Sequence, residues 1–296
     1  MTKKQSPQST NKLVTLTNAL LLSGIFVGLL LLQSAVWAGR AFFSTKTFSS
    51  TVTNSLTSQS SRDAISTELV NKALDDRPIV RRVIGPRLTS GVSSLLNSSI
   101  AESSIRTMSD RLQTYLTTSD QSQKTVAIDV TGLKTVIQTV SSLVGTSDDQ
   151  TIPSDKLPDT ITIIDAEKVP SYYQYGKILY YLSPLSALLV IGCAIGYIKR
   201  SKNGYRRLYV VCATVASSTL AAIAMGPLFK PAVLELAKTT STRTIVGNLY
   251  DAFLALFTQQ LLLVLVLSVL VAIALFLVQN YKTIVGFFSK NRLTTK

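Results

Sequence analysis

The chain has 296 residues, 46% of them hydrophobic, and a formal net charge of +14. It contains no histidine, which removes the commonest general base and the usual zinc ligand, so we expect no catalytic residue, no metal and no other cofactor. The basic excess does not indicate nucleic-acid binding, because none of the folded regions predicted below has a basic excess.

Four long uncharged stretches interrupt the sequence. About 20 apolar residues in a helix span a hydrocarbon core of about 30 Å, so each stretch is long enough to cross a membrane. The expected fold class is therefore a mainly α membrane protein with four transmembrane helices. We place these helices at residues 13–39, 176–198, 208–229 and 253–281.

The basic residues indicate how these helices are oriented. Segments 1–12, 199–207 and 282–296 carry three, five and four basic residues and no acidic one. Lys and Arg in short loops stay on the cytoplasmic side, so we expect a multi-pass plasma-membrane protein with both termini in the cytoplasm and 40–175 and 230–252 outside. The residues of the middle segment that set this topology are Lys199, Arg200, Lys202, Arg206 and Arg207.

The first predicted span also resembles a secretory signal peptide. Val36 and Ala38 occupy positions that a signal peptidase accepts. The uncharged run, however, has 27 residues, whereas the apolar core of a signal peptide has about 7 to 15. We therefore expect an uncleaved anchor rather than cleavage after Ala38.

Small residues four apart mark two of the spans. Such spacing lets helices approach closely, and we expect packing within one bundle; the alternative is a homo-oligomer formed through the first pair. The pairs are Gly24 with Gly28 and Gly192 with Gly196.

The spans hold both cysteines of the chain and, apart from Lys177 at the outer end of the second span, no Asp, Glu, Lys or Arg. Cys193 and Cys212 lie at matching depths and are expected to be packing residues that could be neighbours. Ion-coupled transport normally leaves ionisable residues in the membrane, so a pump or coupled transporter is disfavoured.

The first part of the exported segment 40–175 has mainly helical periodicity. Residues 44–61 are rich in Ser and Thr and read either as an amphipathic continuation of the first span or as a stalk. Pro78 is expected to begin a new helix, which Gly85 and Pro86 should end. Further helices are predicted up to Leu116, and the outer loop 230–252 is expected to form a helical pair at the membrane interface.

The second part changes to β-branched runs. TVAIDV (125–130) and TITII (160–164) are predicted strands that flank a helix, so we expect a small two-stranded parallel sheet. Similarly placed strand ends could bring Asp129 and Asp165 together, although a role for Asp129 as a helix N-cap is favoured. The connection also holds carboxylates whose spacing is not that of a calcium loop, and turn formation explains them better. They are Asp148, Asp149, Asp155 and Asp159.

The order of these parts, with the strings VAIDVTGL and LPDTITII, resembles a group of uncharacterised four-span bacterial integral membrane proteins that carry a large exported helical domain between spans 1 and 2. The resemblance implies a topology and a bacterial plasma-membrane setting. It implies no activity.

One basic cluster in the exported domain could bind phosphate-rich envelope polymers or lipid headgroups, because guanidinium groups pair well with phosphates. The favoured interpretation is a solvated helix face balanced by neighbouring carboxylates, since segment 40–175 has 14 basic and 14 acidic residues. The cluster consists of Arg77, Arg81, Arg82 and Arg87.

These observations predict a non-enzymatic envelope protein. Its bundle contacts the lipid bilayer, and its exported domain serves binding or scaffolding with an envelope protein, a wall polymer or a lipid as partner. The alternative is a component of a membrane transport or lipid-translocation system. No nucleic-acid partner is expected.

Overall fold

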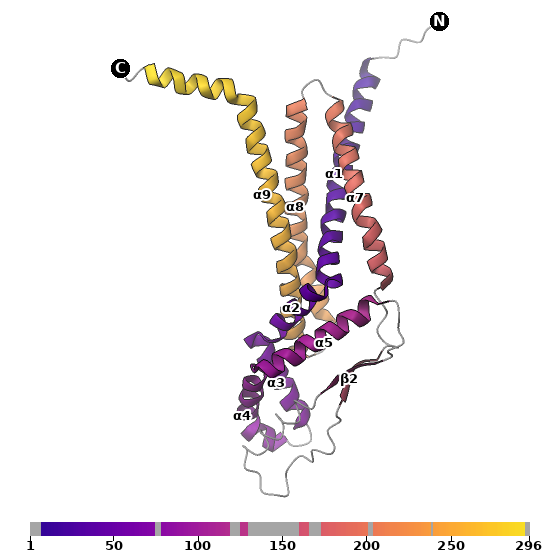
Figure 1. Ribbon diagram of the computed structural model, residues 1–296, viewed down its shortest axis with the longest axis vertical. Coiled ribbons are helices and arrows are strands. Elements are labelled where there is room, and N and C mark those ends of the chain that lie inside the picture. The colour runs from indigo at the N-terminus through magenta and orange to yellow at the C-terminus, as the bar shows by residue number, and fades with distance from the viewer. Residues whose placement is uncertain are drawn as a thin grey trace. The chain divides into compact units, whose positions relative to one another are not determined.

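A computed structural model describes residues 7–74, 78–118, 125–129, 160–165, 173–200, 204–237 and 239–293 (Figure 1). Most of this part of the chain is helical, which confirms the expected mainly α class, and four helices are long and apolar enough to cross a membrane, as a multi-pass protein requires. These spans are Val14–Phe43, Tyr173–Lys199, Arg206–Glu235 and Thr240–Asn280.

The chain divides into two compact units. The first unit, here called the bundle, comprises Met1–Trp37, Leu179–Pro227 and Phe257–Lys296. The second, here called the helical unit, comprises Ala38–Ile178 and Leu228–Leu256. It therefore includes the predicted outer loop together with the predicted exported segment.

The bundle is built from parts of α1 (Pro7–Phe43), α7 (Tyr173–Lys199), α8 (Gly204–Glu235) and α9 (Thr240–Leu293). Continuous helix satisfies every internal backbone amide and carbonyl, which a bilayer requires of a spanning segment. α1 is central, because it contacts α7 through two glycines, α8 through a side-chain hydrogen bond and α9 through a hydrogen bond to its backbone.

Two helix ends differ from the sequence-based expectation. α8 continues through Pro227 and past the predicted end at residue 229 to Glu235, and α9 begins at Thr240; most of the loop is thus helical, as predicted, but its two helices are continuous with the spans. A proline inside a helix removes one backbone hydrogen bond, and membrane helices tolerate this loss. At the start of α9, the Thr239 hydroxyl accepts a 3.1 Å hydrogen bond from the amide of Thr242, which is an N-cap contact.

The helical unit contains α2 (Thr45–Leu56), α3 (Gln59–Ala73), α4 (Pro78–Leu96) and α5 (Ser99–Thr117). The Ser/Thr-rich segment after the first span is thus helix rather than stalk. Pro78 does begin a helix, but the predicted end at Gly85 and Pro86 is wrong, because α4 runs through both residues. Gly85 faces α3, where a Cβ would lie 4.0 Å from Val70, and this packing stabilises the continuous helix.

Polar side chains join the helices of this unit. Thr45 donates a 2.8 Å hydrogen bond to Gln113 of α5, and the amide nitrogen of Gln113 donates to the backbone carbonyl of Phe42 at 3.2 Å. The ring of Phe253, in α9, stacks on Phe42 with centroids 5.1 Å apart. Many buried residues of the unit carry hydroxyls, namely Ser49, Thr51, Thr53, Ser55, Ser61, Ser66 and Ser109.

Strands β1 (Thr125–Asp129) and β2 (Thr160–Asp165) pair antiparallel, so the predicted parallel orientation is wrong. Antiparallel pairs are the commoner and slightly more stable arrangement. Asp129 pairs with Thr160 and Asp165 with Thr125, which puts the two aspartates about four residues, or about 13 Å, apart along the ladder. The predicted proximity of these carboxylates is therefore also wrong. The helix and the four aspartates predicted between the strands lie outside the described residues.

Candidate functional site

α4 presents an exposed apolar stripe. Ile79 and Val83 are 79% and 72% exposed, and Pro86 is also exposed on the same face, since these residues follow each other at intervals of four and three. At 3.6 residues per turn, Arg82 lies about 60° to one side of Ile79 and Arg87 about 80° to the other. Both arginines are exposed. We call these five residues the α4 face.

The predicted arginine cluster is therefore not one patch. Arg81 lies on the side of α4 opposite Ile79, where it is partly buried and makes an interaction of its own. Arg77 lies outside the described residues. Arg82 and Arg87 lie on either side of the apolar stripe of α4. The sequence alone did not predict this stripe, because the helix was expected to end at Gly85 and Pro86.

Gly24 and Gly28 pack against α7. A Cβ at Gly24 would lie 2.8 Å from the Sγ of Cys193, and one at Gly28 would lie 2.9 Å from Cγ2 of Val190. Contacts this close are typical of small residues at a helix–helix interface, and they place α7 over this face of α1. Gly196 of α7 approaches Leu21, whereas a Cβ at Gly192 would meet nothing within 4 Å. The thiols of Cys193 and Cys212 are both free.

A polar cluster crosses the bundle between three helices. The Gln33 side chain is 4% exposed and donates a 2.9 Å hydrogen bond to the hydroxyl of Thr219, while Gln260 donates to the backbone carbonyl of Gln33 at 3.2 Å. Among the described residues, the side-chain carbonyl of Gln33 has no hydrogen-bond partner. Sequence reasoning missed this cluster; its signal is a glutamine inside each of two apolar runs.

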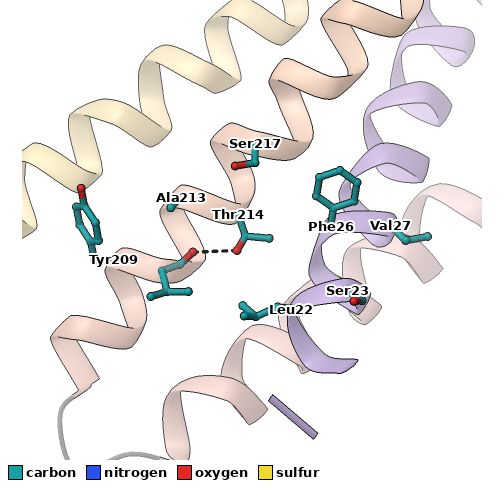
Figure 2. Close-up of a pocket in the computed structure, with 9 residues that line it drawn as sticks. Leu22, Ser23, Phe26, Val27, Tyr209, Ala213, Thr214 and Ser217 are labelled. Atoms are coloured by element: carbon teal, nitrogen blue, oxygen red, sulfur yellow. Dashed lines mark hydrogen bonds between the residues drawn. The ribbon is translucent and has the colours of Figure 1, made fainter. Parts of the chain in front are cut away.

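A groove of about 490 Å³ lies between α1 and α8. Figure 2 shows Leu22 and Phe26 on α1 and Thr214 on α8 on the facing sides of the two helices. None of the lining residues is buried, so the groove opens at the surface of the bundle. Its α1 wall consists of Leu22, Ser23, Phe26 and Val27, and its α8 wall of Tyr209, Val210, Ala213, Thr214 and Ser217.

The basic residues at the start of α8 have different roles. Arg207 is held against α7, where it donates a 2.6 Å hydrogen bond to the carbonyl of Tyr197 and lies 4.8 Å from the centre of that ring. Arg206 is exposed, as are Lys199 and Arg200 at the end of α7. Lys202 lies outside the described residues.

Within the described ranges, no group of three or more Cys, Asp or Glu side chains is placed to hold a metal ion. No known family matches this sequence, and neither a curated protein nor a solved structure shows significant similarity to it.

Proposed function

We propose that this protein is a non-enzymatic membrane protein of the cell envelope, in which the bundle anchors the helical unit and the helical unit binds another envelope protein. The α4 face carries this proposal. Scattered apolar side chains are common on protein surfaces, but an exposed apolar stripe between two arginines has the composition of a protein interface, with an apolar centre and a polar rim rich in Arg.

The orientation that we propose rests on charge. The segments 1–12, 199–207 and 282–296 contain twelve basic and no acidic residues, which favours the cytoplasmic side for all three. The helical unit would then face the outside, where an envelope partner can reach α4.

The chemistry of the α4 face favours a protein over a wall polymer. A polyanionic polymer could pair with Arg82 and Arg87, but it would leave Ile79 and Val83 in water. An apolar groove rimmed by carboxylates would cover both kinds of side chain. α4 itself carries three arginines and no acidic residue, so its charge is complementary to such a rim.

Site-specific photocrosslinking in intact cells tests this proposal. We expect a crosslinker at Ile79 to give an adduct of one discrete mass with a protein, and a crosslinker at Thr107, an exposed residue of α5, to give none. Arg82→Glu with Arg87→Glu should abolish the adduct, whereas Arg82→Lys with Arg87→Lys should retain it. An adduct that forms equally in the double Glu variant and the double Lys variant would contradict the proposal, and so would an adduct formed with lipid alone.

A further inference from the structure

We infer that the groove between α1 and α8 binds one acyl chain of an anionic glycerophospholipid, whose phosphate pairs with Arg206. The first observation is the composition of the groove. Leu22, Phe26, Val27, Val210 and Ala213 give it a largely apolar lining, and it opens at the bundle surface, where lipid chains are the solvent.

The second observation is the position of Arg206. Residues 206, 210, 213 and 217 follow each other at intervals of four, three and four, so Arg206 continues the same stripe of α8 that forms the groove wall. Arg206 is exposed, whereas the guanidinium of the neighbouring Arg207 donates a hydrogen bond to the carbonyl of Tyr197 and lies over its ring. An exposed arginine therefore lies about one helical turn before the first groove residues of α8.

The length of the stripe suits one leaflet. From Arg206 to Ser217 the helix rises about 16 Å, roughly half of a hydrocarbon core of about 30 Å. Tyr209 is 52% exposed one turn after Arg206, which is the place of an aromatic residue at the level of the headgroups. A chain in the groove would thus reach the middle of the bilayer while its phosphate stays beside Arg206.

Charge selects the anionic headgroup. Lys199 and Arg200 are also exposed at the end of α7, and the connection between α7 and α8 contains no acidic residue. Basic pockets between membrane helices beside such a connection attract anionic lipid headgroups, and one Arg near the surface contributes about fivefold to their binding. A zwitterionic headgroup would gain much less from the same guanidinium.

Native mass spectrometry of the purified full chain, titrated with phosphatidylglycerol or phosphatidylcholine, tests the inference. We expect the first bound lipid to be phosphatidylglycerol with about fivefold preference. Arg206→Gln should remove the preference, whereas Arg200→Gln, which removes a charge at the end of α7 and not on the α8 stripe, should retain most of it. Ala213→Leu places an aliphatic side chain in the groove and should weaken binding of both lipids.

Three results would overturn the inference. The first is equal binding of the two lipids by the unaltered protein. The second is an equal loss of preference in Arg200→Gln and Arg206→Gln, which would mean that net charge alone attracts lipid. The third is binding of oleate, a free fatty acid, as tight as that of phosphatidylglycerol, which would show that the site recognises a chain and a negative charge without the phospholipid.

Discussion

Gly24 and Gly28 determine how closely α1 approaches α7. The Cβ of any other residue at Gly24 would lie within 2.8 Å of the Sγ of Cys193, so the backbones are nearer than larger side chains permit. The sequence spacing predicts this kind of contact, but it does not say which helix is the partner. The structure identifies Cys193 and Val190 of α7 as the residues opposite these glycines.

This geometry predicts that Gly24→Cys forms a disulfide with Cys193. The new Cβ would lie 3.8 Å from the Cβ of Cys193, within the 3.5 to 4.5 Å that a disulfide requires. In a Cys212→Ala background, mild oxidation of membranes should remove both thiols, as counted by maleimide tagging of the denatured protein. Gly39→Cys is the control, because a Cβ there meets nothing within 4 Å; two free thiols in the Gly24→Cys protein after oxidation would refute the α1–α7 contact.

The hydrogen bond between Gln33 and Thr219 gives a second prediction at this scale. Interhelical hydrogen bonds in membranes contribute about 0.6 kcal/mol on average and up to about 1.7 kcal/mol. A double-mutant cycle of Gln33→Leu and Thr219→Val should therefore show a coupling energy in this range, measured from the free energy of unfolding in mixed micelles.

The matched control replaces Thr219→Val by Ser218→Ala. The Ser218 hydroxyl donates to the backbone carbonyl of Phe26 and not to Gln33, so this second cycle should be additive. Equal coupling energies in the two cycles would mean that the measured effect is general loosening of the bundle rather than the hydrogen bond.

At the scale of helices and strands, the sequence predicts that a helix forms better than it predicts where that helix ends. The apolar runs predict all four spans, because a bilayer leaves a spanning chain no other way to satisfy its backbone. Proline is a weaker signal: Pro86 and Pro227 each remove one hydrogen bond, and neither helix ends there. Strand direction is not predictable from two short β-branched runs, since either direction can follow from a long connection.

The same lesson applies to the candidate site. The arginines of α4 are visible in the sequence, but which of them share a face depends on whether the helix continues through Pro86. Because it does continue, Arg87 joins Arg82 beside the apolar stripe and Arg81 does not. The polar cluster in the bundle likewise depends on the relative depth of three helices, because it joins Gln33, Thr219 and Gln260. No local sequence pattern predicts that depth.

A continuous α4 predicts that Pro86→Ala stabilises the protein. Alanine restores the amide that can donate to the carbonyl of Arg82, and an interior proline costs about 3 kcal/mol, so we expect a gain of up to that size in the free energy of unfolding. Thermal unfolding of the full chain, followed by circular dichroism, measures it. Pro78→Ala is the control, because proline is favourable at the first position of a helix. If α4 ended at Gly85, Pro86→Ala would give no gain.

At the scale of the whole molecule, the distribution of charge makes a prediction about orientation. Every acidic residue lies between Asp63 and Asp251, and the termini and the connection between α7 and α8 carry basic residues alone. We therefore propose that the net charge of +14 reflects placement relative to a membrane more than affinity for a polyanion. The helical unit and the basic connection should consequently lie on opposite sides.

Cysteine accessibility measures this directly. In a chain with Cys193→Ala and Cys212→Ala, a membrane-impermeant maleimide should label Thr107→Cys in intact cells, because Thr107 is exposed on α5 of the helical unit. Arg200→Cys, exposed at the end of α7, should react only after the membrane is permeabilised. Removing one of the twelve basic charges should leave the orientation unchanged, because the bias is spread over three segments. Labelling of Arg200→Cys in intact cells would show that the orientation is the opposite of the one we propose. The α4 face would then lie in the cytoplasm, where the proposed envelope partner could not reach it.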